Sequence, residues 1–266
     1  MNAISVVIIT RNEEHNIVSC IRSARLISDD IIVVDANSDD QTTDLARSER
    51  AMVFSLGWQG YGFARNFGAA RAKHNWVLSL DADERISTDL AVSISKLTLL
   101  NLNCIFSFRR ENYLDKHKIK FGTLGFETVK RLYNRNHAQW DLTLVHEKLE
   151  SQKSSRKRIA GHIDHYGFKT EKDYRAKATL YAQMSAEKYL LQGKSAGFVK
   201  RYVSPAFNST KSFIFQLGFL DGKIGWTSAR IIAYYTWLKY LYLHQMVESS
   251  KTRSLTFSSK QQVERA

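Results

Sequence analysis

The chain has 266 residues, of which 44% are hydrophobic, so it can bury a substantial core. Its two cysteines, Cys20 and Cys104, lack the spacing of metal ligands, which excludes a disulfide framework and favours a reducing, cytoplasmic setting. The first residues lack the pattern of a secretory signal, and no run reaches the ~20 apolar residues that span a bilayer. We therefore expect neither export nor an integral membrane protein.

The net charge of +13 is unevenly distributed. Residues 1–152 contain 19 Lys and Arg against 19 Asp and Glu, whereas residues 153–266 contain 20 against 7. The basic excess therefore belongs to the C-terminal part alone. This asymmetry predicts a catalytic domain joined to a region that meets an anionic surface.

The first third of the chain alternates short apolar runs with segments of helical spacing. The predicted strands are residues 4–9, 30–35, 51–54 and 76–80. This alternation predicts right-handed βαβ units and a parallel sheet covered on both faces. Thr10, Asp35, Trp58 and Asp81 fall just beyond the ends of these strands, so we expect them to converge on one edge of the sheet.

After a predicted helix at residues 90–99, the pattern changes to longer segments rich in strand formers. Residues 104–113, 128–133 and 140–149 are predicted to extend the sheet as antiparallel strands and to form the acceptor side of a cleft.

A basic, serine-containing stretch at residues 153–158 is the predicted domain boundary. An amphipathic helix is predicted at residues 172–191, and two or more helices crowded with aromatic and basic residues at 197–245. The predicted fold class is therefore α/β: a Rossmann-like domain with a mixed sheet at residues 1–152, followed by a helical region at 153–266. Within the first domain, about residues 1–100 form the donor-binding half and about 101–152 the acceptor side.

Three carboxylates follow the fourth predicted strand, in the order Asp81, Asp83 and Glu84. Carboxylates at the carboxyl edge of a sheet repel one another unless a cation lies between them, and a hard divalent ion bound to a diphosphate fits this position. The first strand is not followed by a Gly-x-Gly-x-x-Gly loop, so phosphate binding through glycine-loop amides is not expected. We predict Mg²⁺ or Mn²⁺ as the cofactor.

Four segments resemble glycosyltransferase family 2 in both order and spacing. They are Ile-Ile-Thr-Arg-Asn-Glu-Glu at 8–14, Ile-Val-Val-Asp-Ala-Asn-Ser-Asp at 32–39, Ala-Arg-Asn-Phe-Gly at 64–68 and Leu-Asp-Ala-Asp-Glu-Arg at 80–85. The resemblance implies the GT-A fold, which binds nucleotide sugars.

Further segments resemble one bacterial branch of this family, the β-1,4-glucosyltransferases of the lipopolysaccharide inner core. They are Trp-Gln-Gly-Tyr-Gly at 58–62, Arg-Leu-Tyr at 131–133, Val-His-Glu at 145–147, His-Tyr at 165–166 and Gly-Phe-Leu-Asp-Gly at 218–222. The likeness extends to about residue 243.

The resemblance implies a nucleotide site at the ends of the first two strands. Asp35 is expected to accept a hydrogen bond from the uracil ring, while Thr10, Asn12 and Glu13 frame the uridine. A second interpretation of Asp35 is a capping residue for the following helix.

Arg65 is the candidate ligand of the diphosphate, with an ordinary ion pair as the alternative. Asp83 and Asp81 are the predicted metal residues: Asp83 is expected to bind the ion itself, and Asp81 to orient either the ribose or a metal-bound water.

An inverting transfer also requires a base for the acceptor hydroxyl. Glu147 is the first candidate and Asp141 the second; a purely structural carboxylate is the alternative for Glu147. His146 is expected to orient its neighbour or an acceptor phosphate.

The predicted function is inverting transfer of a sugar, glucose from UDP-glucose above others, to a lipid-linked phosphorylated oligosaccharide of the inner core. We expect a peripheral protein on the cytoplasmic face of the inner membrane, held by anionic lipid, with no protein partner and no nucleic acid. Transfer to a polyprenyl phosphate or a capsular glycan is the nearer alternative, and nucleic-acid binding is the non-enzymatic one.

The many aromatic residues between 198 and 245 have two possible roles. They suit the headgroup region of a membrane, and they equally suit packing of the helices onto the catalytic domain.

Overall fold

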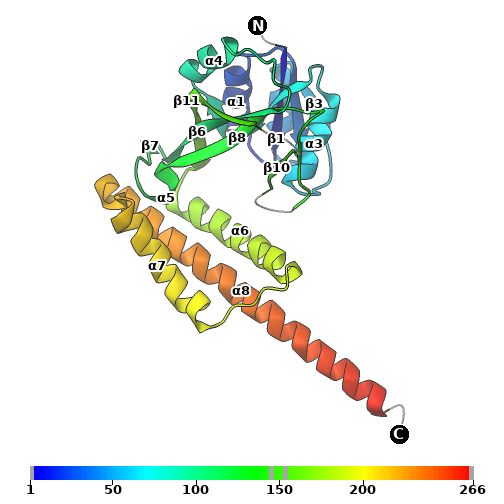
Figure 1. Cartoon of the computed structure of the whole chain (residues 1–266), viewed down its shortest axis with the longest axis vertical. Coiled ribbons are helices and arrows are strands. Elements are labelled where there is room, and N and C mark those ends of the chain that lie inside the picture. The colour runs from blue at the N-terminus through cyan, green and yellow to red at the C-terminus, as the bar shows by residue number, and fades with distance from the viewer. Residues whose placement is uncertain (1–2, 144–146, 152–154, 264–266) are drawn as a thin grey trace. The chain divides into compact units, whose positions relative to one another are not determined.

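Four parallel strands form the first part of the sheet in this computed structural model, three of them buried and the fourth, at the sheet edge, partly exposed (Figure 1). The structure describes residues 3–143, 147–151 and 155–263, with residues 251–263 described by backbone alone. The parallel strands are β1 (Ile4–Thr10), β2 (Ile31–Asp35), β3 (Met52–Ser55) and β4 (Trp76–Asp81), in the spatial order β3-β2-β1-β4. Their positions match the predicted strands, and the predicted parallel arrangement is confirmed.

Helices cover both faces of these strands. Successive residues of a strand point to opposite faces, so one strand contributes side chains to both cores. Val6 and Ile8 of β1 pack in one core with Ile17 of α1, whereas Val7 packs in the other core with Ala69 of α3. The connecting helices are α1 (Ile17–Ala24), α2 (Thr42–Ser48) and α3 (Tyr61–Arg71).

Helix α3 lies close against β1 because Gly68 has no side chain. A Cβ atom at Gly68 would lie 2.4 Å from Cγ1 of Val7 and 3.0 Å from Cγ2 of Val34. Such distances are not tolerated between carbon atoms, so glycine is required at this contact. The close packing sets the position of the side chains that α3 carries toward the site.

The sheet continues beyond β4 with longer strands and becomes mixed. Strand β8 pairs antiparallel with both β4 and β6, β11 pairs parallel with β6, and β5 pairs antiparallel with β11. These strands are β5 (Glu84–Ile86), β6 (Cys104–Leu114), β8 (Glu127–Asn134) and β11 (Ser155–Phe168), with β7 (His117–Lys118) beside β6. The predicted antiparallel extension is confirmed for β6 and β8.

The extended sheet curls back on itself. Strand β5 follows β4 almost directly in the chain, yet the spatial order β4-β8-β6-β11-β5 places three strands between them. Only a curled sheet satisfies both conditions. Helix α4 (Thr88–Ser95) packs on β11, and the short α5 (Gly122–Gly125) precedes β8.

Two details of the predicted acceptor side are wrong. Residues 140–149 do not form one strand: β9 (Gln139–Trp140) and β10 (Leu149–Glu150) are two short strands that pair with each other. The basic stretch predicted as a boundary loop enters β11, where Arg156 pairs with Ile105 of β6. Because residues 155–158 are exposed, the strand accommodates their charges without burying them.

The chain divides into two compact units, Met1–Lys169 and Thr170–Ala266, so the division follows β11 and the predicted boundary at residue 152 precedes it. Helix α6 (Glu171–Leu191) begins at a capping box: the Thr170 side chain accepts from the Asp173 backbone N–H, and the Asp173 carboxylate accepts from Thr170. This confirms the predicted helix.

The rest of the second unit is also helical, as predicted. A continuous helical path is formed by η1 (Val199–Val203), α7 (Ser204–Thr210) and η2 (Lys211–Phe215). A short turn, η3 (Gly218–Asp221), then leads into the long α8 (Gly222–Val263), which packs against α6 and α7 (Figure 1). No helix among the described residues is both long enough and apolar enough to cross a membrane.

Candidate active site

The polar ends of the central strands meet at one edge of the sheet. In the strand register, Thr10 of β1 pairs with Asp35 of β2, and Ile9 of β1 pairs with Asp81 of β4. The carboxyl ends of β1, β2 and β4 are therefore level with one another. The predicted convergence of Thr10, Asp35 and Asp81 is confirmed.

The loops after β1 and β2 are joined by hydrogen bonds. The Asn12 amide donates to Oγ of Ser38 (2.8 Å), and Oδ1 of Asn12 accepts from the Asp39 amide (3.0 Å). The Glu13 amide donates to Oγ1 of Thr42 (2.8 Å). Asn12 has a φ of 53°, a left-handed conformation that asparagine tolerates better than most residues. These hydrogen bonds fix Asn12 and Glu13, two of the residues predicted to frame the uridine, at this edge of the sheet.

Asp35 is fully buried at the base of this edge. One oxygen of its carboxylate accepts from the Ser38 amide (2.9 Å), and the other accepts from the Ser38 hydroxyl. The hydrogen bonds expected of a turn-capping aspartate are therefore present. Its hydrogen bond to uracil stays a prediction.

Arg65 of α3 lies at the centre of a buried charge cluster and is only 2% exposed. Its Nη1 donates to Oγ of Ser79 (2.6 Å), and its Nη2 donates to Oδ1 of Asp81 (2.6 Å). Its Nε donates to Oε1 of Glu147 (3.3 Å), and the guanidinium lies over the Trp140 ring, 4.8 Å from the centroid. Every nitrogen of this guanidinium donates within the protein, so contact with a diphosphate would require Arg65 to exchange one of these partners.

A second buried arginine, Arg131 of β8, holds the other oxygen of Asp81. Its Nη2 donates to Oδ2 of Asp81 (2.8 Å) and to Oε1 of Glu84 (2.7 Å). Burial tends to raise the pKa of Asp81, but the guanidinium groups of Arg131 and Arg65 outweigh it and hold that pKa well below its usual range. Asp81 therefore stays ionised at neutral pH and is bound from both sides.

Arg110 of β6 extends this network. Its Nη1 lies 3.3 Å from Oε1 of Glu84, and its Nε and Nη2 form a bidentate pair with Glu127 (3.0 and 2.6 Å). Glu84 is fully buried, and it is compensated by Arg110 and Arg131. No role was predicted for Arg110 or Arg131; the one available signal was the Arg-Leu-Tyr segment at 131–133.

Asp83 faces a histidine of the distant strand β11. Its Oδ2 lies 3.4 Å from Nε2 of His165, and its backbone oxygen accepts from the Tyr166 amide (2.8 Å). The Nδ1 atom of His165 lies 2.6 Å from Oδ1 of Asn112. The Asn112 amide group donates to the Leu124 carbonyl (2.7 Å) and to Glu127 (2.9 Å), which fixes its oxygen toward His165.

This arrangement decides which nitrogen of His165 carries the proton when the ring is neutral. Nδ1 must donate to the Asn112 oxygen, so Nε2 turns its lone pair toward the Asp83 carboxylate. Two electron-pair donors at this separation repel each other unless a cation joins them, either a metal ion or a proton on Nε2 that makes the contact an ion pair. A carboxylate oxygen and an imidazole nitrogen are ligands that Mn²⁺ and related divalent ions accept. Asp83 and His165 therefore fit a metal ion, whereas both oxygens of Asp81 are already held by arginines.

The two candidate bases have different surroundings. Glu147 is largely buried and shares the Arg65 guanidinium with Asp81. The Asp141 carboxylate instead accepts from the amide and the hydroxyl of Thr143 within its own loop (3.2 and 2.6 Å). Glu147 thus belongs to the charge cluster, and Asp141 belongs to a local turn. His146 lies outside the described residues.

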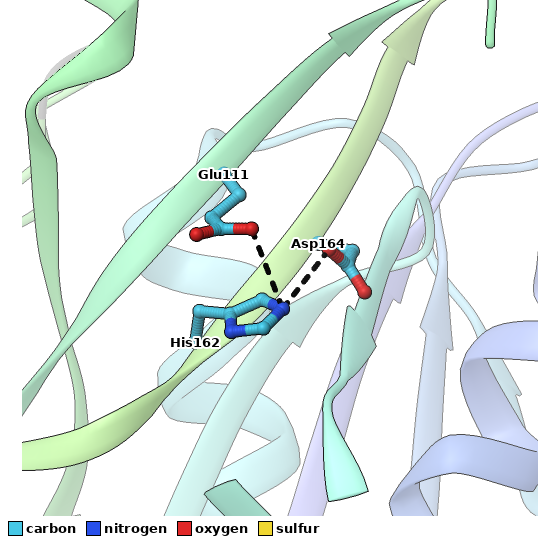
Figure 2. Close-up of side chains that lie close together, drawn as sticks. All are labelled: Glu111, His162 and Asp164. Carbon is cyan, nitrogen blue, oxygen red and sulfur yellow. Dashed lines mark ion pairs between the residues drawn. The ribbon is translucent and has the colours of Figure 1, made fainter. Parts of the chain in front are cut away.

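A second group with metal-ligand chemistry lies on β6 and β11 (Figure 2). Ligand atoms of Glu111, His162 and Asp164 lie within 4.8 Å of one another, and Nε2 of His162 is 3.4 Å from each carboxylate. Strand alternation places these side chains opposite to Asn112 and His165.

The second group already contains a cation. Nζ of Lys118 lies 2.5 Å from Oε2 of Glu111, so the lysine ammonium neutralises the carboxylate that a metal would require. This group is separate from the predicted metal residues, and Lys118 and Arg109, both paired with Glu111, supply two positive charges beside its two carboxylates.

Comparison with known proteins identifies the family. The family model described as "Glycosyl transferase family 2" matches residues 5–163, which include the parallel strands, the charge cluster and the Asp83 loop. The chain belongs to glycosyltransferase family 2. It is a glycosyltransferase, and the predicted family is confirmed. The predicted fold class is confirmed as well, since a Rossmann-like parallel half, a mixed sheet and C-terminal helices are all present.

Two related proteins match almost the whole length of this chain. An uncharacterized glycosyltransferase of Rickettsia typhi is 27% identical over 278 residues, which cover 97% of this chain and 91% of that protein. The lipopolysaccharide core biosynthesis glycosyltransferase LpsC of Rhizobium meliloti is 23% identical over 249 residues, covering 91% and 92%.

Among solved structures, glucosyl-3-phosphoglycerate synthase of Mycobacterium tuberculosis, in complex with Mn²⁺, uridine diphosphate and glucosyl-3-phosphoglycerate, is 26% identical with a TM-score of 0.33. That match covers 41% of this chain and 44% of the solved one, so the chain spans less than half of the solved structure.

Proposed function

We propose that this glycosyltransferase moves glucose from UDP-glucose, with inversion, onto an inner-core sugar of lipopolysaccharide at the cytoplasmic face of the membrane. The pairing of Asp83 with His165 beside the buried charge cluster carries this proposal. The relative LpsC supports the acceptor class, because it is named for lipopolysaccharide core biosynthesis and is matched over 92% of its length.

The donor diphosphate would be bound with a divalent ion held by Asp83 and His165. When bound, Mg²⁺ or Mn²⁺ would neutralise the diphosphate charge and stabilise UDP as the leaving group. Asn112 holds the His165 ring in the tautomer that this role requires. We propose Asp83 and His165 as the metal ligands, in place of the Asp83 and Asp81 set predicted from sequence.

Asp81 and Arg65 would act mainly by positioning. Since Asp81 is bound by both Arg65 and Arg131, it fixes the strand end that leads to Asp83, while its exposed edge remains available to the ribose. The uridine would lie along the hydrogen-bonded loops that carry Thr10, Asn12 and Glu13, above Asp35.

Glu147 is the proposed base. As the acceptor oxygen forms its bond to the anomeric carbon, the bond from that carbon to the phosphate oxygen breaks, and the hydroxyl proton passes to the Glu147 carboxylate. Attack from the face opposite to the leaving group inverts the anomeric centre. The hydrogen bond from Arg65 would hold the carboxylate in one orientation between the donor and the acceptor side.

The acceptor would be a phosphorylated, lipid-linked oligosaccharide, and the basic second half of the chain suits both its phosphates and an anionic membrane surface. Family membership favours this enzyme over the nucleic-acid-binding alternative. A polyprenyl phosphate or a capsular glycan would use the same donor site, and only the acceptor distinguishes them.

Mass spectrometry of the core oligosaccharide tests this proposal. A strain that lacks the protein should make a core shortened by one hexose, and the wild-type chain should restore that hexose while the Asp83→Ala chain should not. An unchanged core together with an altered capsule or glycolipid would reject the lipopolysaccharide acceptor and favour the alternative.

A further inference from the structure

The helical path through η1, α7 and η2 turns its large apolar side chains outward. Six aromatic rings at the start of this path, along it, on η3 and on the first turns of α8 are each 47–74% exposed. We call them the apolar edge: Phe198, Tyr202, Phe207, Phe215, Phe219 and Trp226. A helix that packs in water shows the opposite arrangement, because its apolar face is the one that is covered.

The covered side of the same path is small and polar. Pro205 and Ser212 are its buried residues, and Nδ2 of Asn208 donates to Oγ1 of Thr236 on α8 (3.3 Å). The first turns of α8 bury Thr227 and Ser228 together with the apolar Ala229 and Ile231. Small and hydroxyl-bearing residues between helices, with large apolar residues outside, are typical of helices surrounded by lipid.

The turn η3, which connects η2 to α8, is also closely packed. A Cβ atom at Gly225 would lie only 1.7 Å from the carbonyl oxygen of Gly218, so the start of α8 touches η3 directly. The Phe213 ring lies against Phe219 and Trp226, with centroids 6.4 and 5.3 Å away. This contact holds the last two rings of the apolar edge at a fixed place beside η2.

Basic residues accompany the apolar edge. Residues 198–230 contain five of them and a single acid, Asp221. The basic residues are Lys200, Arg201, Lys211, Lys223 and Arg230, all exposed except Arg201, which is half-buried. Exposed rings bordered by cations complement a surface that is apolar inside and anionic at its rim, which describes the headgroup region of an anionic bilayer.

We propose that the apolar edge inserts into one leaflet of an anionic membrane, with the neighbouring Lys and Arg side chains at the level of the lipid phosphates. The helices lie in the interface, in keeping with the absence of a spanning helix among the described residues. The inference builds on the proposed function in one respect: it explains how an enzyme for a lipid-linked acceptor reaches it. Insertion itself requires no sugar chemistry.

Insertion of rings and attachment by charge alone predict different salt dependences of membrane binding. Electrostatic binding is screened by salt, and each cation at the surface contributes roughly 5-fold to the partition coefficient at low salt. Buried rings contribute through the hydrophobic effect, which salt does not weaken. High salt should therefore lower the binding of the full chain without abolishing it.

Sedimentation with vesicles tests the proposal on the full-length protein without donor or acceptor. Wild-type protein should bind vesicles that contain phosphatidylglycerol and bind those of phosphatidylcholine much more weakly. The double variant Phe207→Ser, Phe215→Ser should lose binding by ~100-fold or more. The matched control is Leu180→Ser, Leu191→Ser, which removes two exposed apolar side chains of α6 and should bind like wild type.

The depth to which the apolar edge inserts is measured by quenching of tryptophan fluorescence with lipids brominated on their acyl chains. Wild-type fluorescence should be quenched, and most of that quenching should be absent in Trp226→Phe but retained in Trp237→Phe. Equal quenching in all three proteins, or a Phe207→Ser, Phe215→Ser variant that binds vesicles normally, would overturn the proposal. Circular dichroism and UDP binding establish that each variant is folded.

Two results separate this inference from the proposed function. Vesicle insertion without any glucosyl transfer would reject the function and leave the insertion intact. Glucosyl transfer to a soluble core oligosaccharide, by a protein that never binds vesicles, would support the function and reject the insertion. If sedimentation velocity shows a dimer that Phe207→Ser, Phe215→Ser dissociates, the edge is an interface between two copies and the membrane assignment is wrong.

Discussion

The two units of this chain depart from ordinary packing in different ways. In the first unit, β1 is buried along its whole length, and arginines and carboxylates compensate one another in a buried cluster at the sheet edge. In the second, α8 packs apolar residues such as Leu243 beside α6, but the path through η1, α7 and η2 covers Ser212 and exposes rings such as Phe207 and Phe215. A residue's surroundings, more than its type, therefore indicate its role in each unit.

In the first unit the unusual feature is buried charge. A buried arginine or carboxylate costs free energy unless it is paired, so a cluster held together by three arginines must be retained for what it positions. In the second unit the unusual feature is exposed apolar surface, which carries a similar penalty in water. Each departure from ordinary packing coincides with a region that we propose for binding, the donor site in the first unit and the apolar edge in the second.

The largest expected effect follows from removing the carboxylate that faces His165. Asp83→Ala should abolish glucosyl transfer and metal-dependent UDP binding, because one of the two proposed metal ligands is lost, while the fold remains intact. Isothermal titration calorimetry of UDP with and without Mn²⁺ measures this, with Asp89→Ala on the exposed start of α4 as control. Full metal-dependent UDP binding by Asp83→Ala would remove Asp83 from the metal site.

The next effect is on stability and distinguishes buried charge from surface charge. Arg131→Met should lower the free energy of unfolding by about 3–5 kcal/mol, because Glu84 and Asp81 lose the guanidinium between them. Urea denaturation provides the measurement. Arg156→Met, at an exposed position of β11, should change it by less than about 0.5 kcal/mol. Similar values for the two variants would contradict the role given to the cluster.

A smaller loss is expected when the proposed base becomes an amide. Glu147→Gln keeps the shape and can still accept the Arg65 hydrogen bond, but it cannot take a proton, so kcat should fall by ~10² or more with little change in UDP affinity. Asp141→Asn should stay within several-fold of wild type, since that carboxylate is bound to Thr143. An inactive Asp141→Asn beside an active Glu147→Gln would reverse the assignment.

The smallest effect concerns the start of the second unit. Thr170→Ala removes the side chain that caps α6 and should destabilise that helix by about 1 kcal/mol, whereas Thr170→Ser, which retains the hydroxyl, should be nearly neutral. Hydrogen exchange of the first turn of α6 reports the change. Equal exchange in both variants would show that the cap does not control this helix end.

Local patterns in the sequence were sufficient for much of the first unit. The β-branched runs of β1 and β2 predicted buried strands, and Asp35 at the end of β2 and Asp81 at the end of β4 predicted which edge carries the site. Local patterns failed at residues 155–158, where basic residues indicated a loop, because an exposed strand can carry charges on its outer side.

The remaining features depend on contacts between distant segments. His165 meets Asp83 because the sheet curls until β5 pairs with β11, and Arg131 meets Asp81 because β8 lies beside β4. Neither pairing follows from spacing in the sequence. Likewise, the aromatic residues after residue 197 indicated either packing or a membrane, and the fold separates them: Tyr235 is hydrogen-bonded to Ser185, whereas Phe207 is exposed.

Direct assay of the purified protein tests the central claim. UDP-glucose, Mn²⁺ and a core oligosaccharide lacking the hexose should yield UDP and a product with one new β-linked glucose, identified by its anomeric proton in NMR. The Asp83→Ala protein should yield none. An α-linked product would contradict inversion, and undiminished transfer by Asp83→Ala would contradict the proposed site.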